Sequence, residues 1–333
     1  MKIIVDVMSG DKSPAEVLMG CAAAVEELNT EIIAVGKETE IIKLMAENEI
    51  SDKNIEIFDA PDVITMEDEP TSILKEKNNT SMAVALKLLK EGKGDAVVSP
   101  GNTGALLAGG TFIVKRIKGV KRAALAPILP VKTGFTMIID SGANVVCKPE
   151  YLDQFGLMGS VYMNKVMGID TPKVGLANNG SEETKGNDLC LEAYPLLKAN
   201  KNINFIGNVE GRGIMMGECH VLVCDGFTGN LILKTCEGAG IFMLGLMKEI
   251  FMGNIRTKLA AFMIKKSLKK LKKRLDYNEI GGAVLMGVAK PVIKAHGSSD
   301  RRAIKNAIRQ AVKVCNANVA ETIEKAIADS VEE

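Results

Sequence analysis

Val97 to Gly110 reads VVSPGNTGALLAGG and sets a pattern that recurs along the chain. An apolar run typical of a buried strand ends in a polar turn with two glycines, and the residues after the turn are typical of a helix. Glycine lets a ligand approach the backbone, and the first N–H groups of a helix lack partners and carry the positive end of its dipole. Two interpretations stay open: the turn is an anion site, or it is a tight strand-to-helix connection capped by Thr103.

The same strand-then-helix order fills the first third of the sequence. KIIVDVM precedes SPAEVLMGCAAAVEEL, EIIAVG precedes ETEIIKLMAENE, and IEIFDAP precedes NTSMAVALKLLKEGK. This order predicts an α/β fold with a mostly parallel sheet and helices on both faces. No repeat or low-complexity linker divides the 333 residues, so we expect a single α/β domain over residues 1–333.

Five predicted strands end in similar polar tails. Besides the turn after Val98, the runs FTMIIDSGAN, KVGLANNGSE, INFIGNVEG and HVLVCDGFTGN each end in Asp, Asn, Glu or Gly. The carboxyl ends of parallel strands lie at one edge of a sheet, where α/β proteins bind their ligands. We therefore expect one shared polar site, although an ordinary loop explains any single tail.

Composition excludes several classes of function. The net charge is +1, aromatic residues make up 4% and Trp is absent, so we expect no nucleic-acid partner. The seven cysteines include no C-x-x-C pair and the chain has two histidines, so we expect reduced thiols and no metal. The N-terminus lacks a signal peptide pattern, and no stretch has about 18 uncharged apolar residues. These features favour a cytoplasmic protein.

One segment departs from the rest, at about residues 240–276. It is rich in Met and Phe at first, and then nine Lys and Arg residues without an acid lie between Arg256 and Arg274. Ile264, Leu268, Leu271 and Leu275 repeat at helical spacing and predict a protruding basic amphipathic helix. Three interpretations stay open: contact with an anionic membrane, docking of an acidic protein, or packing in a dimer. The residues expected to make such a contact are Phe262, Met263, Lys265, Lys266, Lys269, Lys270, Lys272 and Lys273.

Individual polar residues in the tails have both chemical and structural interpretations. His296 precedes Gly297, Ser298 and Ser299 at the expected start of the last helix, which is a second candidate anion site unless one of the serines only caps that helix. Lys185 is either a phosphate ligand or a solvated loop lysine. Asp225 directly follows a buried strand and is a catalytic carboxylate, a helix cap or a ligand to a backbone turn.

Taken together, the tails resemble one known family. DVMSGDKSP, SPGNTGALLAGG, IIDSGANVVCKPEYLDQFGLMGSVY, GLANNGSEETKGND, FIGNVEGRGIMMGECHVLVCDGFTGNLILKTCEG, DYNEIGGAVLMGV and AHGSSDRRAIKNAI occur in the order typical of the bacterial acyl-acyl-carrier-protein:phosphate acyltransferases, the PlsX family. The resemblance covers nearly the whole chain. Ser9 stands where the family commonly has glycine, and Pro100 removes one N–H from the turn that would face phosphate.

The resemblance implies a three-layer α/β/α sandwich related to phosphotransacetylases and to isocitrate and isopropylmalate dehydrogenases. It implies transfer of a long-chain acyl group from acyl carrier protein to inorganic phosphate, giving acyl phosphate for phospholipid synthesis. It also implies a homodimer loosely associated with the inner face of the cell membrane. Phosphate is itself the nucleophile and a thiolate leaves readily, so we expect no cofactor. The alternatives are a phosphotransacetylase acting on acyl-coenzyme A, a dehydrogenase and a non-catalytic membrane scaffold.

The expected site residues combine this resemblance with the chemistry of the tails. We predict catalytic roles for Lys185, Asp225 and Asn230. The residues expected to bind phosphate or the rest of the substrate are Asp6, Ser99, Gly101, Asn102, Thr103, Gly104, Asn144, Asn178, Asn208, Glu210, His296 and Ser298.

Overall fold

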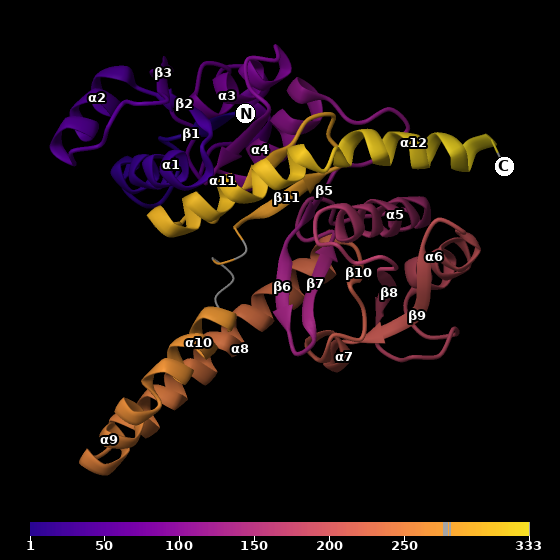
Figure 1. Cartoon of the computed structure of the whole chain (residues 1–333). Helices are drawn as coiled ribbons and strands as arrows, with labels where there is room; N and C mark the ends of the chain where they lie inside the picture. Colours follow the sequence, from indigo (N-terminus) through magenta and orange to yellow (C-terminus); the bar gives the residue numbers. More distant parts are fainter. Residues whose placement is uncertain (276–278, 280, 333) are drawn as a thin grey trace.

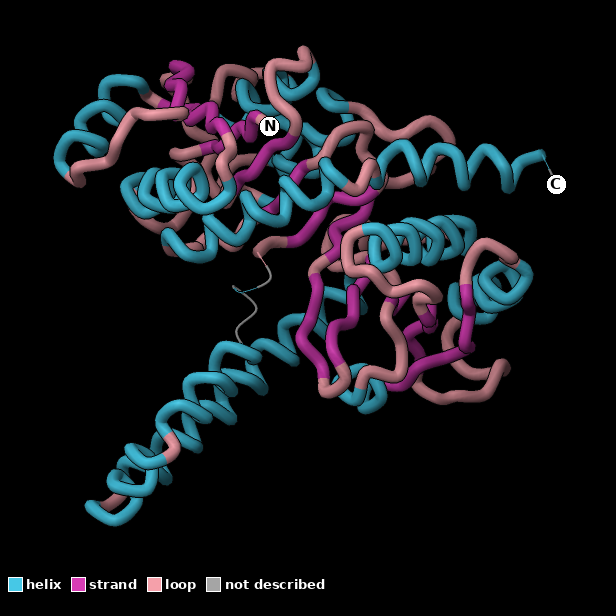
Figure 2. Tube along the Cα trace, in the orientation of Figure 1, coloured by secondary structure: helices cyan, strands magenta, loops and turns pink. Residues whose placement is uncertain are grey.

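The computed structural model describes residues 1–275, 279 and 281–332, with the side chains of 272–275 and 330–332 left undescribed. The strands divide between two sheets (Figures 1 and 2). The first sheet has seven strands, in the spatial order β3 (Ile55–Asp59), β2 (Glu31–Gly36), β1 (Lys2–Asp6), β4 (Ala96–Ser99), β12 (Val292–Lys294), β11 (Ala283–Met286) and β5 (Ala124–Ala126). From β3 to β12 these strands are parallel, whereas β11 is antiparallel to both of its neighbours.

The first sheet is covered on both faces. α1 (Pro14–Leu28) and α11 (Arg301–Asn316) pack against each other on one face, and α2 (Glu38–Glu47) lies beside them. On the other face lie α3 (Ser81–Lys90), α4 (Thr103–Gly109) with its π-helical extension η2 (Gly110–Val114), and the 3₁₀ helix η1 (Pro70–Leu74). Both faces of the strands are therefore apolar, which explains the continuous Val and Ile runs in the sequence.

The second sheet has five strands, in the order β6 (Ile128–Val131), β7 (Gly134–Ile139), β10 (Val221–Val223), β8 (Lys173–Asn178) and β9 (Asn204–Glu210). Only β6 is antiparallel. α5 (Pro149–Lys165) and α6 (Asp188–Ala199) cover one face, and α7 (Gly211–Met216) and the start of α8 (Gly226–Met252) cover the other. Each sheet is the middle of three layers, so the predicted α/β/α class is confirmed. The strands are divided between two separate sheets.

A single hydrophobic core connects the two sheets. It joins Ile3 and Val98 of the first sheet to Ile139 and Val223 of the second. α12 (Val319–Glu332) packs against α5 and extends this core. The hydrophobic core is therefore continuous from one sheet to the other. The facing edges of the two sheets border the site described below.

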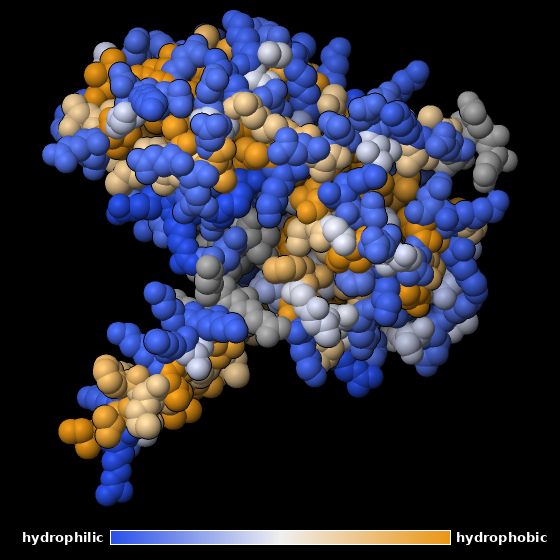
Figure 3. Space-filling model, in the orientation of Figure 1, coloured by the Kyte–Doolittle hydropathy of each residue, from blue (hydrophilic) through white to orange (hydrophobic). Residues whose placement is uncertain are grey.

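A helical hairpin projects from this body. α8 runs outward, α9 (Ile255–Met263) forms the tip, and α10 (Lys265–Leu275) runs back toward the body (Figure 1). The predicted basic helix is divided, because Ile264 ends α9 and only Lys265–Leu275 forms the amphipathic basic helix. Ile255, Phe262 and Met263 are 84%, 73% and 79% exposed, so the tip presents apolar side chains to solvent (Figure 3).

By length and hydropathy alone, α8 is able to cross a membrane. Every stretch of 18 residues in it includes a charged residue, in agreement with the sequence analysis. Its first turn instead packs on the second sheet, since Gly226 and Gly229 lie against Asp140. α8 therefore begins as a part of the α/β body.

Candidate active site

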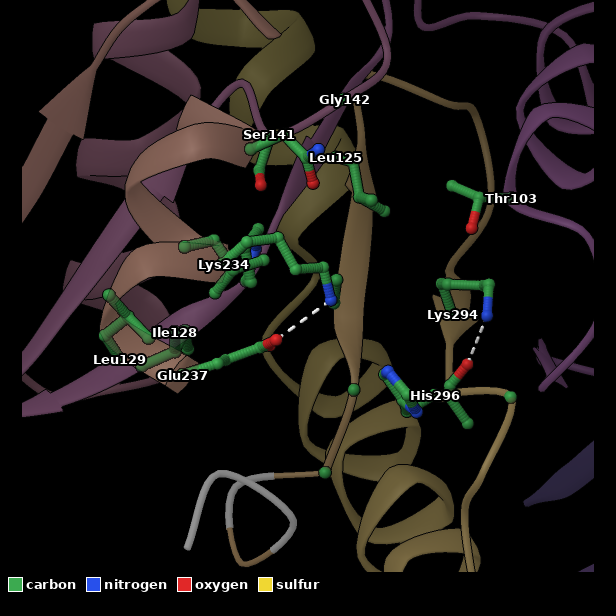
Figure 4. Close-up of a pocket in the computed structure, with 18 of the residues that line it drawn as sticks. Thr103, Leu125, Ile128, Leu129, Ser141, Gly142, Lys234, Glu237, Lys294 and His296 are labelled. Atoms are coloured by element: carbon green, nitrogen blue, oxygen red, sulfur yellow. Dashed lines mark hydrogen bonds and ion pairs between the residues drawn. The ribbon is translucent and has the colours of Figure 1, made fainter. Parts of the chain in front are cut away.

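A cleft of about 450 Å³ lies between the two sheets (Figure 4). One wall follows the carboxyl ends of β1, β4 and β12, with Asp11, Thr103, Lys294 and His296. In the first sheet the strand order reverses between β1 and β4, which is where open α/β sheets bind ligands. The opposite wall comes from the end of β7 and from α8, with Ser141, Gly142, Asn230, Lys234 and Glu237.

The β4–α4 turn holds Thr103 at the cleft. Asn102 caps α4, accepting a hydrogen bond from the N–H of Ala105 at 3.0 Å, and its amide donates to the carbonyl of Thr65. The interpretation of Thr103 as the cap is therefore wrong: Thr103 is the first residue of the helix and lines the cavity. Because the side chain of Asn102 is engaged in capping, this turn offers the Thr103 hydroxyl and helix N–H groups to a ligand.

Asp6 lies behind the turn and is fully buried. Its carboxylate accepts hydrogen bonds from the hydroxyls of Ser9, Ser81 and Ser99, at 3.0, 2.7 and 2.7 Å. Burial raises the pKa of Asp6, while these hydroxyls oppose the shift. Asp6 and Ser99 therefore brace the turn from behind, and neither lines the cleft.

Gly101 and Gly104 serve close packing in the same turn. A methyl group at Gly101 would meet Met82 and Ser9, and one at Gly104 would meet Pro70 at 2.7 Å. Their predicted contact with phosphate stays a prediction. The packing shows why larger residues would move the turn.

The turn after β12 forms the rest of this wall. His296 Nδ1 lies 2.8 Å from the hydroxyl of Ser298, and desolvation together with Lys234 and Lys294 lowers the pKa of His296. Asp300 caps α11 through the N–H groups of Arg302 and Ala303, so the interpretation of Ser298 or Ser299 as the cap is wrong. α11 is also followed by α12, so it is not the last helix.

The start of α8 forms the opposite wall. Asp225 caps this helix, accepting hydrogen bonds from the N–H and the hydroxyl of Thr228 at 2.9 and 2.7 Å. Among its three interpretations the structure shows the cap. Asn230 lies beside Gly142 at the cavity, and Lys234 pairs with Glu237 at 2.9 Å further along the helix (Figure 4). Asp225 therefore fixes the helix turn that carries Asn230.

The end of β7 contributes a side chain that the sequence analysis missed. Ser141 is 2% exposed, lines the cleft, and its hydroxyl has no hydrogen-bond partner among the described residues. The neighbouring Asp140 is buried and accepts hydrogen bonds from the N–H of Leu125 at 2.8 Å and from the N–H of Asn144 at 2.6 Å. Asn144 also donates its amide to Asp140 and to the carbonyl of Ala123, so it braces the turn. An unpaired buried hydroxyl is costly, which makes Ser141 a candidate ligand-binding group.

The tails of β8 and β9 lie on the other side of α8. They border a second cavity of about 430 Å³, which Asn178 lines together with Thr228 and Ile232 of α8. The amide of Asn178 donates to the carbonyl of Lys185, and the amide of Asn208 donates to the carbonyl of Glu182. The expectation of one shared site is therefore wrong for these tails.

Three predicted site residues, Lys185, Asn208 and Glu210, lie outside the cleft. Lys185 is exposed in the loop after β8. Glu210 pairs with Arg212 at 2.8 Å. Nothing in the structure brings Lys185, Asn208 or Glu210 to the cleft, and their roles stay predictions.

The hairpin residues lie away from both cavities. Phe262 and Met263 are exposed at the tip, and Lys265, Lys266, Lys269 and Lys270 are exposed on α10. The side chains of Lys272 and Lys273 lie outside the described part. The structure therefore separates this surface from the cleft.

Thiol and metal chemistry have few candidates. All seven cysteines are free, and burial raises the pKa of Cys21 and Cys219 to about 12, which keeps both protonated at neutral pH. Within residues 1–275, 279 and 281–332, no group of three His, Cys, Asp or Glu side chains is placed to hold a metal ion.

The fold is similar to that of phosphotransacetylases of known structure. A phosphotransacetylase from Streptococcus pyogenes has a similar structure, with a TM-score of 0.63 at 17% identity over 95% of this chain and 94% of that chain. A putative 4-hydroxythreonine-4-phosphate dehydrogenase from Salmonella typhimurium gives a TM-score of 0.54 at 11% identity, covering 94% and 99% of the two chains. These likenesses confirm the predicted fold class.

The sequence itself narrows the class to one family. Residues 1–322 match the family described as fatty acid synthesis protein. Phosphate acyltransferase of Acetivibrio thermocellus is 49% identical over 94% of this chain and 92% of its own length, and that of Clostridioides difficile is 46% identical over 100% and 98%. The chain belongs to this family of phosphate acyltransferases, as the resemblance of its motifs predicts.

Proposed function

We propose that the protein transfers a long-chain acyl group from the thioester of acyl carrier protein to inorganic phosphate, giving acyl phosphate and free carrier protein. The observation that carries the proposal is the cleft between the sheets. Thr103, at a strand-to-helix turn, and the buried Ser141 both line this cleft of about 450 Å³, and the Ser141 hydroxyl has no hydrogen-bond partner in the described part of the chain. Family membership supplies the acyl and phosphate chemistry.

The reaction needs positioning more than covalent help. An oxygen of hydrogen phosphate bonds to the acyl carbon, the carbon–sulfur bond breaks, and the proton of the phosphate goes to the leaving sulfur. The second pKa of phosphate groups lies about 6 to 7, so the nucleophile is already largely a dianion at neutral pH. The protein therefore has to hold phosphate against the thioester and stabilise the oxyanion that forms between the two steps. This mechanism uses no cofactor and no metal.

The two walls divide these tasks. The wall from the first sheet, with the α4 N-terminus, Thr103 and His296, binds phosphate, because helix N–H groups and hydroxyls suit an anion. Ser298 does not line the cleft and orients the ring of His296. The wall from the second sheet, with Ser141 and Asn230, donates hydrogen bonds to the oxyanion. Asp225 positions Asn230 by capping α8.

A product assay tests the function. The protein is incubated with phosphate and palmitoyl-acyl-carrier protein, and acyl phosphate is trapped with hydroxylamine as hydroxamate. We expect product from the carrier-protein thioester. Product from palmitoyl-coenzyme A alone would instead favour a phosphotransacetylase, and product from neither donor would contradict the proposal.

We also propose that the hairpin tip contacts the anionic inner face of the cell membrane, in a cytoplasmic homodimer. The support is the exposed apolar tip beside the exposed lysines of α10. Amphipathic helices of this kind bury their apolar face at the lipid boundary, and each basic residue near the surface adds about 1 kcal/mol.

Vesicle flotation separates the membrane from the other interpretations of the hairpin. We expect the protein to float with vesicles that contain phosphatidylglycerol, and replacement of Lys265, Lys266, Lys269 and Lys270 by Ser to reduce flotation. If these changes leave flotation intact but weaken the affinity for carrier protein, the basic helix docks the carrier. If neither changes while dimers dissociate in sedimentation, the hairpin is a dimer contact only.

A further inference from the structure

Lys294, the last residue of β12, is nearly buried without a counter-ion. Its side chain is 9% exposed and lines the cleft. Its ammonium donates to the carbonyl oxygens of Pro100, at 3.2 Å, and of Ala295. Among the described residues no carboxylate lies within 4.0 Å of it. A lysine is rarely buried to this extent unless it is paired with an anion, so the burial of Lys294 indicates that an anion binds beside it.

The surrounding charges only partly compensate for burial. Desolvation lowers the pKa of Lys294 to about 8, while Asp11 and Asp6 oppose the shift and Lys234 of the opposite wall adds to it. Asp6 is already engaged by three serine hydroxyls. His296 and Glu237 are the other titratable groups facing this part of the cleft. Two carboxylates, Asp11 and Glu237, and two lysines, Lys234 and Lys294, line the cleft, and Glu237 is paired with Lys234. The ammonium of Lys294 is therefore left with backbone carbonyl oxygens as its direct partners.

The neighbours of Lys294 are those expected of an anion site. Lys294 pairs in register with Ser99 of β4, so it lies beside the turn that leads to Thr103. Figure 4 shows the Thr103 hydroxyl and the Lys294 ammonium on the same wall of the cleft. The start of α4 adds the positive end of a helix dipole at this wall.

We propose that Lys294 is the cation that binds inorganic phosphate, with the Thr103 hydroxyl as its partner on the same wall. This inference rests on the proposed function and assigns the phosphate to one wall of the cleft. An ammonium with a vacant donor direction makes a charge-assisted hydrogen bond to a phosphate oxygen. The phosphodiester of a carrier-protein arm has the same chemistry, but the ammonium lies deep in the cleft, which favours the small free ion.

Steady-state kinetics on Lys294→Met test the inference, with palmitoyl-acyl-carrier protein saturating while phosphate is varied, and the reverse. Loss of a charge-assisted bond is expected to raise the KM for phosphate about 10- to 100-fold, with the KM for the donor changed by less than about threefold. Lys290→Met is the matched control, because Lys290 also donates to a backbone carbonyl, that of Leu89, but lies outside the cleft. A raised KM for the donor alone would show that Lys294 binds the carrier arm and would overturn the inference.

The pH profile gives a second readout. In wild type, kcat/KM for phosphate should fall as pH rises above about 8, where the ammonium loses its proton. Lys294→Arg should extend activity to higher pH, because a guanidinium stays charged. An unchanged alkaline limit in a folded Lys294→Arg variant would contradict the proposal.

Thermal unfolding with added phosphate distinguishes a failure of the inference about Lys294 from a failure of the proposed function. Phosphate should raise the Tm of wild type and of Lys290→Met but not that of Lys294→Met. If wild type makes no acyl phosphate yet shows this pattern, the proposed function fails and the phosphate site stands. If Lys294→Met keeps both the phosphate-dependent Tm rise and the KM for phosphate, the inference fails even if acyl phosphate forms.

Discussion

Replacement of Ser141 by Ala should change stability and activity in opposite directions. Ser141 is 2% exposed, and its hydroxyl has no partner among the described residues. An unsatisfied buried polar group costs about 1 to 3 kcal/mol, so its removal should raise the free energy of unfolding by about 1 kcal/mol and the Tm by about 2 °C. If that hydroxyl donates to the oxyanion, the same change should lower kcat about 10²- to 10³-fold, equivalent to about 3 to 4 kcal/mol.

The assay pairs hydroxamate formation at saturating substrates with a thermal melt of the same preparation. Ser160→Ala is the control, because Ser160 is also buried but lies on α5 away from the cleft. We expect the control to keep its kcat. A kcat within about threefold of wild type in Ser141→Ala would refute the oxyanion role. A kcat loss accompanied by a lower Tm would refute the idea that the hydroxyl is unpaired in the free protein.

Four further predictions test other parts of the structure. In phosphate-free buffer, the free energy of unfolding of wild type should rise relative to that of Lys294→Met between pH 8 and 10.5, by on the order of 3 kcal/mol. The reason is that the pKa of Lys294 is about 8 in the folded protein, so the unfolded chain binds more protons than the folded chain in this range. A difference in urea midpoints that does not change with pH would contradict this. Gly229→Ala drives a methyl group into the carbonyl oxygen of Asp140, so chemical denaturation should show a loss of about 1 to 3 kcal/mol and kcat should fall as Asn230 moves; unchanged kcat and stability would show that α8 does not need this contact. Asp140→Asn turns an amide toward backbone donors and should cost about 3 kcal/mol in urea unfolding, and a midpoint equal to that of wild type would argue against the bracing role. Phe262→Ser should weaken vesicle binding by about 1.5 to 3 kcal/mol with no change in kcat on soluble carrier protein, and undiminished flotation would remove the tip from the membrane contact.

Much of the fold could be predicted because its main strands are buried on both faces. The Val and Ile runs that become β1, β2, β4 and β8 are visible in the sequence, and so are the helices between them. The division into two sheets was not predictable in the same way. The strands β5, β6 and β11 have only three or four residues each, too few to show a periodic pattern.

The sequence predicts several residues of the site correctly, but not which strand ends lie together. Thr103, Asn230 and His296 do line one cleft, although they lie far apart in the sequence. The tails of β8 and β9 could not be separated from it without knowing that α8 runs between the two cavities. Both helix caps lie one residue or more from the interpretation considered, at Asn102 and Asp300, because Ser, Thr, Asn and Asp compete for the same position.

Lys294 and Ser141 were missed for physical reasons. A lysine that follows Pro-Val-Ile is normally a solvated strand end, and only the burial of Lys294 reveals its unusual environment. Ser141 follows Asp140 in a segment whose residues are typical of an ordinary turn, so its residue type gave no sign of a ligand-binding role. The signal that identifies it is an unpaired hydroxyl, which depends on neighbours from other elements.

Crystals soaked in tungstate, an anomalous scatterer that substitutes for phosphate, test most directly where the oxyanion binds. We expect a single strong anomalous peak in the cleft, in contact with Lys294 and Thr103 and facing Ser141. A peak beside Asn178 and Lys185 in the cavity across α8, with none in the cleft, would contradict this expectation.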